Sequence, residues 1–213
     1  MSDPDRSLRI AILHPSYDES DAPFAKMDPT CSPARYLPEA VCTDFFIHKR
    51  TAVKQVIEIA QQGFDVVFNL CDGAWAEDRP GMEVVQALER LNVAFTGAGS
   101  LFYEPTREAM KMACESVGVK FPAYVMARQP EDIERAAALR FPMIVKHPNS
   151  YGSVGLTPQS RVTDVAGLRQ EVARITADYG SALIEEFIEG REFDVLVSEP
   201  REGEDQPWVL PPS

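Results

Sequence analysis

The chain has 213 residues, which is long for one ordinary domain and short for two large ones, so we expect one sizeable domain or two modest ones. Apolar residues make up 45% and charged residues 25%, a composition that excludes a collagen, a coiled coil or a disordered tail. The net charge of −12 repels phosphate backbones and anionic lipids at long range. We therefore expect neither nucleic acid nor a membrane as a partner, and any anionic ligand needs a few placed cations and backbone amides.

The cysteines are few and widely spaced. Cys31, Cys42, Cys71 and Cys114 form no C-x-x-C pair, so the sequence predicts neither a zinc knuckle nor a secreted disulfide framework, and most of them should be reduced thiols in or near the core. The first six residues are polar and the apolar run after them is short, which fits neither a signal peptide nor a membrane span. We expect a cytoplasmic protein.

The first half of the chain predicts strands alternating with helices. Residues 8–13 indicate a buried strand, and residues 15–44, rich in Pro, Asp and Ser, indicate a long irregular connection. Residues 51–62 predict a helix that ends at Gly63. Residues 64–70 are typical of a strand buried on both faces of a parallel sheet.

A helix beginning near Pro80 and a strand at residues 93–96 continue this alternation, which predicts a doubly wound, Rossmann-like parallel sheet through about residue 100. Gly97-Ala98-Gly99 then invites a dinucleotide-binding interpretation, but the third glycine of that fingerprint falls on Phe102. A turn after the strand is the preferred interpretation, and a Rossmann-type oxidoreductase has only these two glycines in its favour.

The second half predicts a small α+β unit. Its first helix should place Ala109, Met110 and Ala113 inward. Near the end of the unit, a tight turn at Glu189-Gly190 should join two strands into a hairpin. The predicted helices are residues 105–117, 130–139 and one after Thr163, and the predicted strands are 121–126, 141–145, 182–184 and 193–197.

Lys146 directly follows the apolar run 141–145. Its charge there has to be balanced by a ligand or a carboxylate, because burying an unpaired charge is costly. The loop S-Y-G-S-V-G, residues 150–155, follows closely, and its small residues allow backbone amides to approach an anion. This arrangement is typical of phosphate binding. A snorkelling lysine before a hairpin would give the same pattern.

Residues 185–193, E-E-F-I-E-G-R-E-F, favour the first interpretation. They resemble the E-E-F-I-x-G-x-E-F signature of the ATP-grasp ligases, in particular of the D-alanine–D-alanine ligases. Other stretches agree with that family in the same order along residues 64–197. They are residues 65–73 (strand and acidic-glycine turn), 95–100 (F-T-G-A-G-S, similar to Y-T-G-S-G), Lys111 with Gly118 (helix end), and 144–155 (similar to V-K-P…G-S-S-V-G).

The resemblance implies that ATP is bound. Lys146 would hold the phosphates, and the loop that carries Ser150, Gly152 and Ser153 would close over them. Arg107 stands where the family usually has its first phosphate lysine. Arginine keeps the charge, although its fork geometry differs from that of lysine.

The resemblance also implies an adenine hinge, in which main-chain groups of Glu185, Glu186, Phe187 and Ile188 read the edge of the base. Glu192 would accept hydrogen bonds from the ribose hydroxyls, which suits a carboxylate with two acceptor oxygens. The alternative for the first two glutamates is a solvated strand face.

The implied catalytic residues are Glu19, matching the carboxylate that receives the substrate ammonium group, and Ser153. Three departures weaken the match to a D-alanine site. Residues 14–17 replace a glycine-rich turn, Gly152 stands where a catalytic serine is common, and Asn69 replaces a histidine. The resemblance therefore implies nucleotide binding more strongly than D-alanine specificity.

The fold we expect is α/β: a parallel-sheet, pre-ATP-grasp domain over residues 1–104 and an α+β ATP-grasp domain over residues 105–213. The second would contain a central subdomain, about 105–184, and the opening of a C-terminal subdomain, 185–213. The implied activity is ATP-dependent carboxylate–amine ligation through an acyl-phosphate, with an amino acid as substrate.

Mg²⁺ is expected for the family with its ligands beyond Ser213, so no residue of the chain is assigned to metal. The chain as given should therefore bind nucleotide without turning it over. A truncated or vestigial module that binds nucleotide without catalysis is the alternative function, and a homodimer is retained as a candidate assembly.

Overall fold

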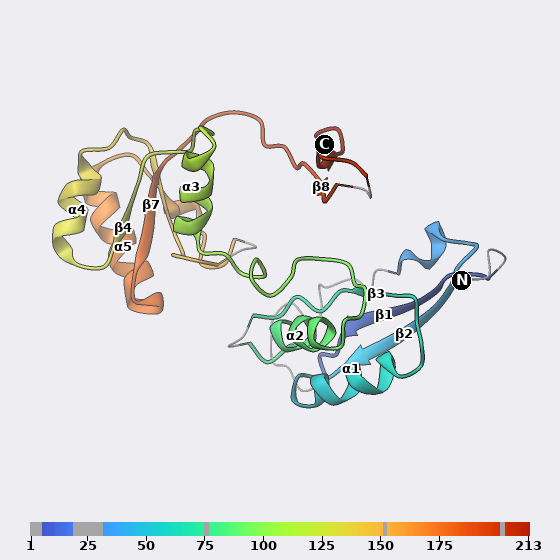
Figure 1. The fold of residues 1–213 in the computed structure, drawn as a ribbon. Coiled ribbons are helices and arrows are strands. Elements are labelled where there is room, and N and C mark those ends of the chain that lie inside the picture. The colour runs from blue at the N-terminus through green and yellow to red at the C-terminus, as the bar shows by residue number, and fades with distance from the viewer. Residues whose placement is uncertain (1–5, 19–31, 75–76, 151–152, 201–202) are drawn as a thin grey trace. The chain divides into compact units, whose positions relative to one another are not determined.

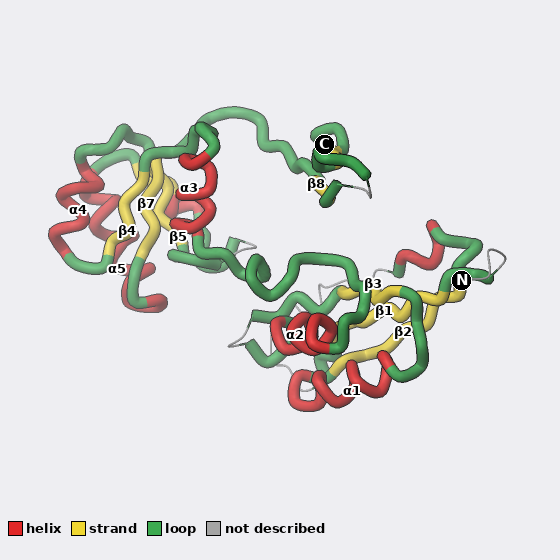
Figure 2. Tube along the Cα trace, viewed as in Figure 1, coloured by secondary structure: helices red, strands yellow, loops and turns green. Residues whose placement is uncertain are grey.

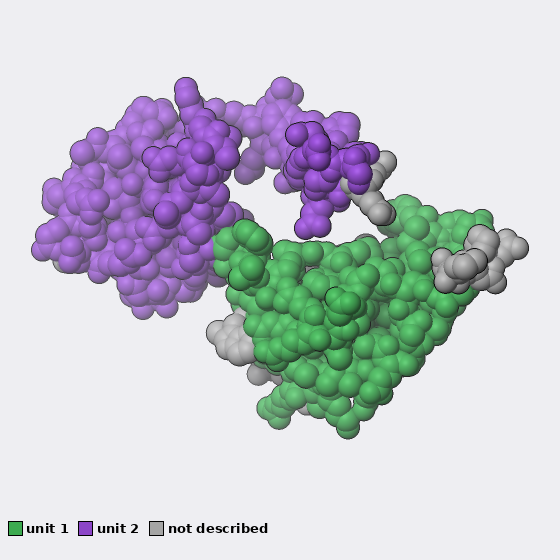
Figure 3. Space-filling view, in the orientation of Figure 1, with its two compact units in different colours: residues 1–105 green, residues 106–213 purple. Residues whose placement is uncertain are grey.

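The structure is a computed structural model that describes residues 6–18, 32–74, 77–150, 153–200 and 203–213. The chain divides into two compact units, residues 1–105 and 106–213 (Figure 3). That these units act as the two functional domains expected from the sequence stays a proposal. None of the helices in the described ranges combines the length and the apolarity needed to cross a membrane.

Unit 1 contains a parallel sheet in the order β2-β1-β3 (Figures 1 and 2). The central strand is buried along its length except at its two ends, as a parallel sheet requires. The short strand expected at residues 93–96 is reduced to one bridge between Val67 and Phe95. The elements are β1 (Arg9–Pro15), η2 (Pro33–Tyr36), β2 (Val41–Ile47), η3 (Lys49–Thr51), α1 (Ala52–Ala60), β3 (Val66–Asn69) and α2 (Met82–Arg90).

The core of unit 1 lies between the sheet and helices α1 and α2. Ala11 and Leu13, on one face of β1, pack in one cluster with Val56 of α1 and Leu88 of α2. Because residues two apart on a strand share a face, both helices cover the same face of the sheet, as Figure 1 shows. The two predicted helices and the first predicted strand are thereby confirmed.

Two predictions for unit 1 need correction. Residues 15–44 were expected to be irregular, but β2 begins at Val41 and pairs with β1 along seven residues. It is an edge strand with most of its side chains at least partly exposed, so Cys, Thr and Asp are tolerated within it and the apolar run is interrupted. β3 was expected to be buried on both faces, but only Val67 is fully buried.

Unit 2 contains a four-stranded antiparallel sheet in the order β4-β7-β5-β6. The α+β character expected for the second half is confirmed. Helix α5 ends at Gly180, whose φ of 76° is the left-handed conformation that favours glycine. The elements are α3 (Arg107–Ser116), β4 (Tyr124–Ala127), α4 (Pro130–Ala137), β5 (Met143–Lys146), η4 (Pro158–Ser160), β6 (Arg161–Val162), α5 (Val165–Tyr179), β7 (Ala182–Glu186), β8 (Val197–Ser198) and β9 (Trp208–Val209).

The core of unit 2 lies between this sheet and helices α4 and α5. Ala136 of α4 and Leu168 of α5 pack with Val145 of β5 and Ile184 of β7. Helix α3 lies on the other side of the sheet in Figure 1. The sheet therefore has one apolar face, which is covered by α4 and α5, and a second face on the side of α3.

The hairpin expected around Glu189-Gly190 is wrong. β7 is an inner strand whose two edges are occupied by β4 and β5, so it has no free edge for residues 193–197. Instead β8 pairs with β9, with Val197 opposite Val209.

Candidate nucleotide-binding site

The face of the unit 2 sheet that lies on the side of α3 carries charged side chains. Val145 and Ile184 face the core beneath α4 and α5. Because successive residues of a strand point to opposite faces, their neighbours Lys146 and Glu185 point to the face on the side of α3. Tyr124 of β4 lies opposite Glu185 in the antiparallel register and shares that face.

Glu185 forms ion pairs with two lysines. Its Oε1 contacts Nζ of Lys111, from α3, and its Oε2 contacts Nζ of Lys146. The side chain of Glu185 is 7% exposed, that of Lys111 10% and that of Lys146 20%. Lys111 also lies over two aromatic rings, with Nζ 5.3 Å from the centroid of Phe121 and 4.8 Å from that of Tyr124.

This cluster has an excess of positive charge. Burial alone would raise the pKa of Glu185, but hydrogen bonds and charge from Lys111 and Lys146 outweigh burial and hold that pKa below its ordinary value. The carboxylate is therefore ionised at neutral pH, and two ammonium groups face one carboxylate. Lys146 is the last residue of β5, shortly before the glycine–serine loop. An excess cation beside such a loop suits an anion such as a phosphate group.

Arg107 and His147 hold the beginning of the loop. The guanidinium of Arg107, the first residue of α3, donates a hydrogen bond to the carbonyl of Ser150. Nδ1 of His147 accepts hydrogen bonds from the backbone amides of Asn149 and Ser150 at 3.0 and 2.7 Å. Burial and the charge of Arg107 lower the pKa of His147, so the ring is neutral at pH 7 and carries its proton on Nε2.

The end of the loop is anchored to α5. Arg174 donates to the carbonyl of Gly155 at 2.7 Å and to both carboxylate oxygens of Glu171 at 2.5 and 2.9 Å. Glu171 is buried and also accepts a hydrogen bond from the Ser160 hydroxyl at 2.7 Å. Gly155 has φ of +73°, and a Cβ there would lie 3.1 Å from the ring of Tyr179, so both conformation and space favour glycine.

The predicted catalytic serine lies inside this loop. Ser153 is exposed, and its φ of 61° is left-handed, which is uncommon for a residue with a side chain. Gly152 lies outside the described residues. The contacts described above hold the two ends of the loop: Arg107 and His147 at Ser150, and Arg174 at Gly155.

The predicted adenine hinge leaves the sheet at the end of β7. Glu186 is half-buried and accepts a hydrogen bond from the backbone amide of Arg140 at 3.0 Å. Phe187 is half-buried, whereas Ile188 is 59% exposed and Glu192 is exposed. Between β7 and β8 the chain forms no helix or strand. The amides of two predicted hinge residues are nevertheless bonded within the unit: that of Glu186 donates to the carbonyl of Ala123 at 3.0 Å, and that of Phe187 donates to the carbonyl of Pro142 at 2.9 Å.

The inward face predicted for α3 is largely wrong. Ala109 and Ala113 were expected to face inward, but both are exposed and Lys111 is the buried residue of α3. The reason is that α3 lies against a charged face, where Glu185 supplies a counter-ion. A signal existed in the sequence, because a glutamate inside an apolar strand requires a buried cationic partner.

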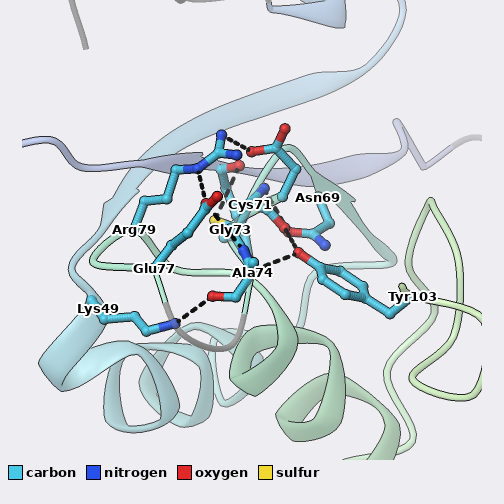
Figure 4. A network of polar contacts seen from close by, with 10 residues as sticks. Lys49, Asn69, Cys71, Gly73, Ala74, Glu77, Arg79 and Tyr103 are labelled. Atoms are coloured by element: carbon cyan, nitrogen blue, oxygen red, sulfur yellow. Dashed lines mark hydrogen bonds and ion pairs between the residues drawn. The ribbon is translucent and has the colours of Figure 1, made fainter. Parts of the chain in front are cut away.

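Unit 1 carries a polar network at the carboxyl end of its parallel sheet (Figure 4). Nε of Arg79 donates to Glu77 at 2.6 Å, and its NH1 group donates to Asp72 at 2.7 Å. Lys49 donates to the carbonyl of Ala74 at 3.3 Å. Ligands of open parallel sheets bind beyond the carboxyl ends of the strands, so this edge is the candidate substrate side of unit 1.

The chain that follows β3 is held by Tyr103 and by a close crossing of Gly73 and Gly81. The hydroxyl of Tyr103 lies 3.1 Å from the carbonyl oxygen of Cys71 and 3.2 Å from that of Gly73. A Cβ on Gly81 would lie 1.8 Å from the carbonyl oxygen of Gly73, so this crossing requires glycine. Asn69, which stands in place of the family's histidine, accepts a hydrogen bond from the amide of Cys71 at 3.1 Å. The predicted catalytic residue Glu19 lies outside the described residues.

The chain is similar to known ligases. The family described as "D-ala D-ala ligase C-terminus" matches residues 113–210. A D-alanine–D-alanine ligase of Ralstonia pickettii is 31% identical over 143 residues, which are 66% of this chain and 41% of that protein. The chain thus spans about two fifths of the length of the curated relatives it matches.

Solved structures agree with this. The D-alanine–D-alanine ligase of Helicobacter pylori has a TM-score of 0.63 at 15% identity, over 97% of this chain and 74% of that one. The corresponding Bacillus anthracis ligase, complexed with ATP, has a TM-score of 0.56 at 15% identity, over 91% of this chain and 62% of that one.

These similar structures establish the fold: the chain has the fold of the ATP-grasp ligases. In sequence the chain is similar to D-alanine–D-alanine ligases, over part of the length of those enzymes.

Proposed function

We propose that the chain binds ATP, with the phosphates at Lys146. The observation that carries the proposal is the cluster of two ammonium groups, one buried and one partly exposed, on one buried carboxylate, beside a glycine–serine loop, in a chain with this fold. A phosphate group would balance the excess charge and accept hydrogen bonds from the loop. ATP in the Bacillus anthracis ligase supports the same ligand class here.

The remaining nucleotide roles follow the same arrangement. Arg107 would hold Ser150 and so fix the start of the loop that covers the phosphates. Main-chain groups of residues 185–188 would read the adenine edge, and the exposed Glu192 would bind the ribose hydroxyls. The loop itself, residues 150–155, is expected to become more protected against hydrogen exchange when nucleotide binds.

The proposed reaction of the whole protein is carboxylate–amine ligation. A carboxylate oxygen of the first substrate attacks the γ-phosphorus of ATP, and the bond to the β-phosphate breaks to release ADP. The amine of the second substrate then attacks the acyl carbon, phosphate leaves, and the amine loses a proton. The contribution of Lys146 would be to neutralise charge on the phosphates.

Mg²⁺ is not assigned to this chain. Among the described residues, no group of three or more His, Cys, Asp or Glu side chains is arranged to hold a metal ion.

Binding of a non-hydrolysable ATP analogue, measured by calorimetric titration, tests the proposal. Lys146→Ala should weaken binding by about 1.5–3 kcal/mol, the value of a hydrogen bond to a charged group. Lys120→Ala is the matched control, because Lys120 is an exposed lysine of the same unit. Equal affinity of the wild-type chain and Lys146→Ala would contradict the assignment.

The ligase activity needs a separate test. ADP release that depends on D-alanine would support ligation, and substitution of Ser153 or Glu19 should then lower its rate. Analogue binding without D-alanine-dependent ADP release would favour the alternative, a nucleotide-binding module without catalysis.

A further inference from the structure

Lys111 has no role in the nucleotide site as proposed, yet it is the buried residue of α3. It shares Glu185 with Lys146, which is the residue assigned to the phosphates. A cation that is held by a buried carboxylate is less available to a ligand. The way in which the two lysines divide Glu185 therefore determines how freely Lys146 can bind an anion.

The two lysines differ in how firmly they are held. Nζ of Lys111 contacts Glu185 and also lies over the rings of Phe121 and Tyr124, so its ammonium group is enclosed on several sides. The side chain of Lys146 is twice as exposed as that of Lys111, and among the described residues it forms one ion pair, with Glu185. Within the described part of the chain, moving Lys146 toward a ligand gives up one ion pair, whereas moving Lys111 gives up an ion pair and its positions over two aromatic rings.

We propose that Lys111 is a positioning residue: it is the resident counter-ion of Glu185 and releases Lys146 to bind the nucleotide phosphates. This rests on the proposed function. With Lys111 in place, Glu185 keeps a partner when Lys146 turns to the phosphates. Without Lys111, Lys146 becomes the sole counter-ion of a buried carboxylate, and drawing it away would leave that charge unpaired.

The consequence is a specific pattern in a double-mutant cycle. Lys111→Met should weaken binding of a non-hydrolysable ATP analogue by about tenfold, within the range of coupling between residues that share a partner. Adding Glu185→Gln should restore the affinity to within about threefold of wild type, because Lys146 no longer has a carboxylate that competes for it. Lys111→Arg keeps the charge and should lose less than Lys111→Met.

The experiment is calorimetric titration of these variants with the analogue, with Lys120→Met as the matched lysine control. Thermal melting of each variant reports folding separately from binding. If Lys111→Met does not fold, Lys111→Gln replaces it, because glutamine is neutral and can still donate a hydrogen bond to Glu185. Rescue by Glu185→Gln without a gain in melting temperature would support the positioning role.

Two results would overturn this inference and leave the proposed function standing. One is wild-type affinity in the folded, uncharged variants Lys111→Met or Lys111→Gln. The other is a double variant that binds as weakly as Lys111→Met, because Lys111 would then contact the phosphates itself. A wild-type chain that does not bind the analogue would overturn the proposed function, and this inference with it.

Discussion

Glu171 is a buried carboxylate whose charge is stabilised by its neighbours. Hydrogen bonds from Arg174 outweigh burial and, together with that of Ser160, lower the pKa of Glu171. A lowered pKa in the folded state stabilises the protein above the pKa of the unfolded chain, about 4.3 for glutamate, and this stability is lost as pH falls through the folded value.

Glu171→Gln should therefore destabilise the chain by about 1–3 kcal/mol at pH 7. The difference from wild type should shrink as the pH falls below about 4. Urea unfolding of both chains at pH 7, 5, 4 and 3 measures it. Glu134→Gln serves as the control, because Glu134 pairs with Arg169 on the surface and should cost little at any pH. A pH-independent difference for Glu171→Gln would contradict this account.

At the scale of residues, the sequence singled out Lys146 because a charge at the end of an apolar strand needs an explanation. The sequence did not foresee the ion pairs of Glu185, which was expected to act through its main chain. The roles of both residues in nucleotide binding stay predictions, because the sequence suggests them and no observation tests them. The sequence failed for Lys111 because helical periodicity assumes an apolar surface for the helix to pack on. The face beneath α3 instead carries Glu185, and only the strand register places that carboxylate there. Which charges pair is set by tertiary contacts that no local pattern contains.

Helix α3, which carries Arg107 and Lys111, begins with a side-chain cap. The Thr106 hydroxyl accepts a hydrogen bond from the amide of Ala109 at 3.0 Å. Thr106→Ala should destabilise unit 2 by about 1 kcal/mol. It should also weaken binding of the ATP analogue by a few-fold, because Arg107 lies in the first turn and Lys111 in the next.

Asp164→Ala is the matched control for this prediction. Asp164 caps α5 by accepting from the amide of Gly167 at 2.8 Å, but the beginning of α5 carries neither Arg107 nor Lys111. Thermal melting should fall in both variants, whereas titration with the analogue should change mainly in Thr106→Ala. Equal loss of binding in the two variants would mean that the effect follows stability alone.

At the scale of elements, continuous apolar runs and helix periodicity predicted β1, β5, α1 and α5, because each of these buries most of one face or both. The predictions failed where pairing partners decide the structure. β2 was missed because an edge strand exposes most of its side chains. The hairpin after β7 was wrong because a sequence does not reveal that both edges of a strand are already occupied.

Each unit has an apolar cluster of its own. Leu88 is almost fully buried in the cluster of unit 1, which joins β1 to α1 and α2. Leu168 is fully buried in the cluster of unit 2, which joins the antiparallel sheet to α4 and α5. Separate clusters predict that the two units lose stability separately, since a cavity weakens the core that contains it.

Leu168→Ala should therefore destabilise unit 2 by about 2–5 kcal/mol and leave unit 1 unaffected. Hydrogen exchange measured by mass spectrometry distinguishes the units: amides of β7 should exchange faster, while those of β1 keep their wild-type protection. Leu88→Ala is the reciprocal variant and should reverse the pattern, exposing β1 and sparing β7. If either substitution accelerates exchange equally in both strands, the chain unfolds as one cooperative body, and the boundary after Pro105 marks a division of contacts rather than of stability.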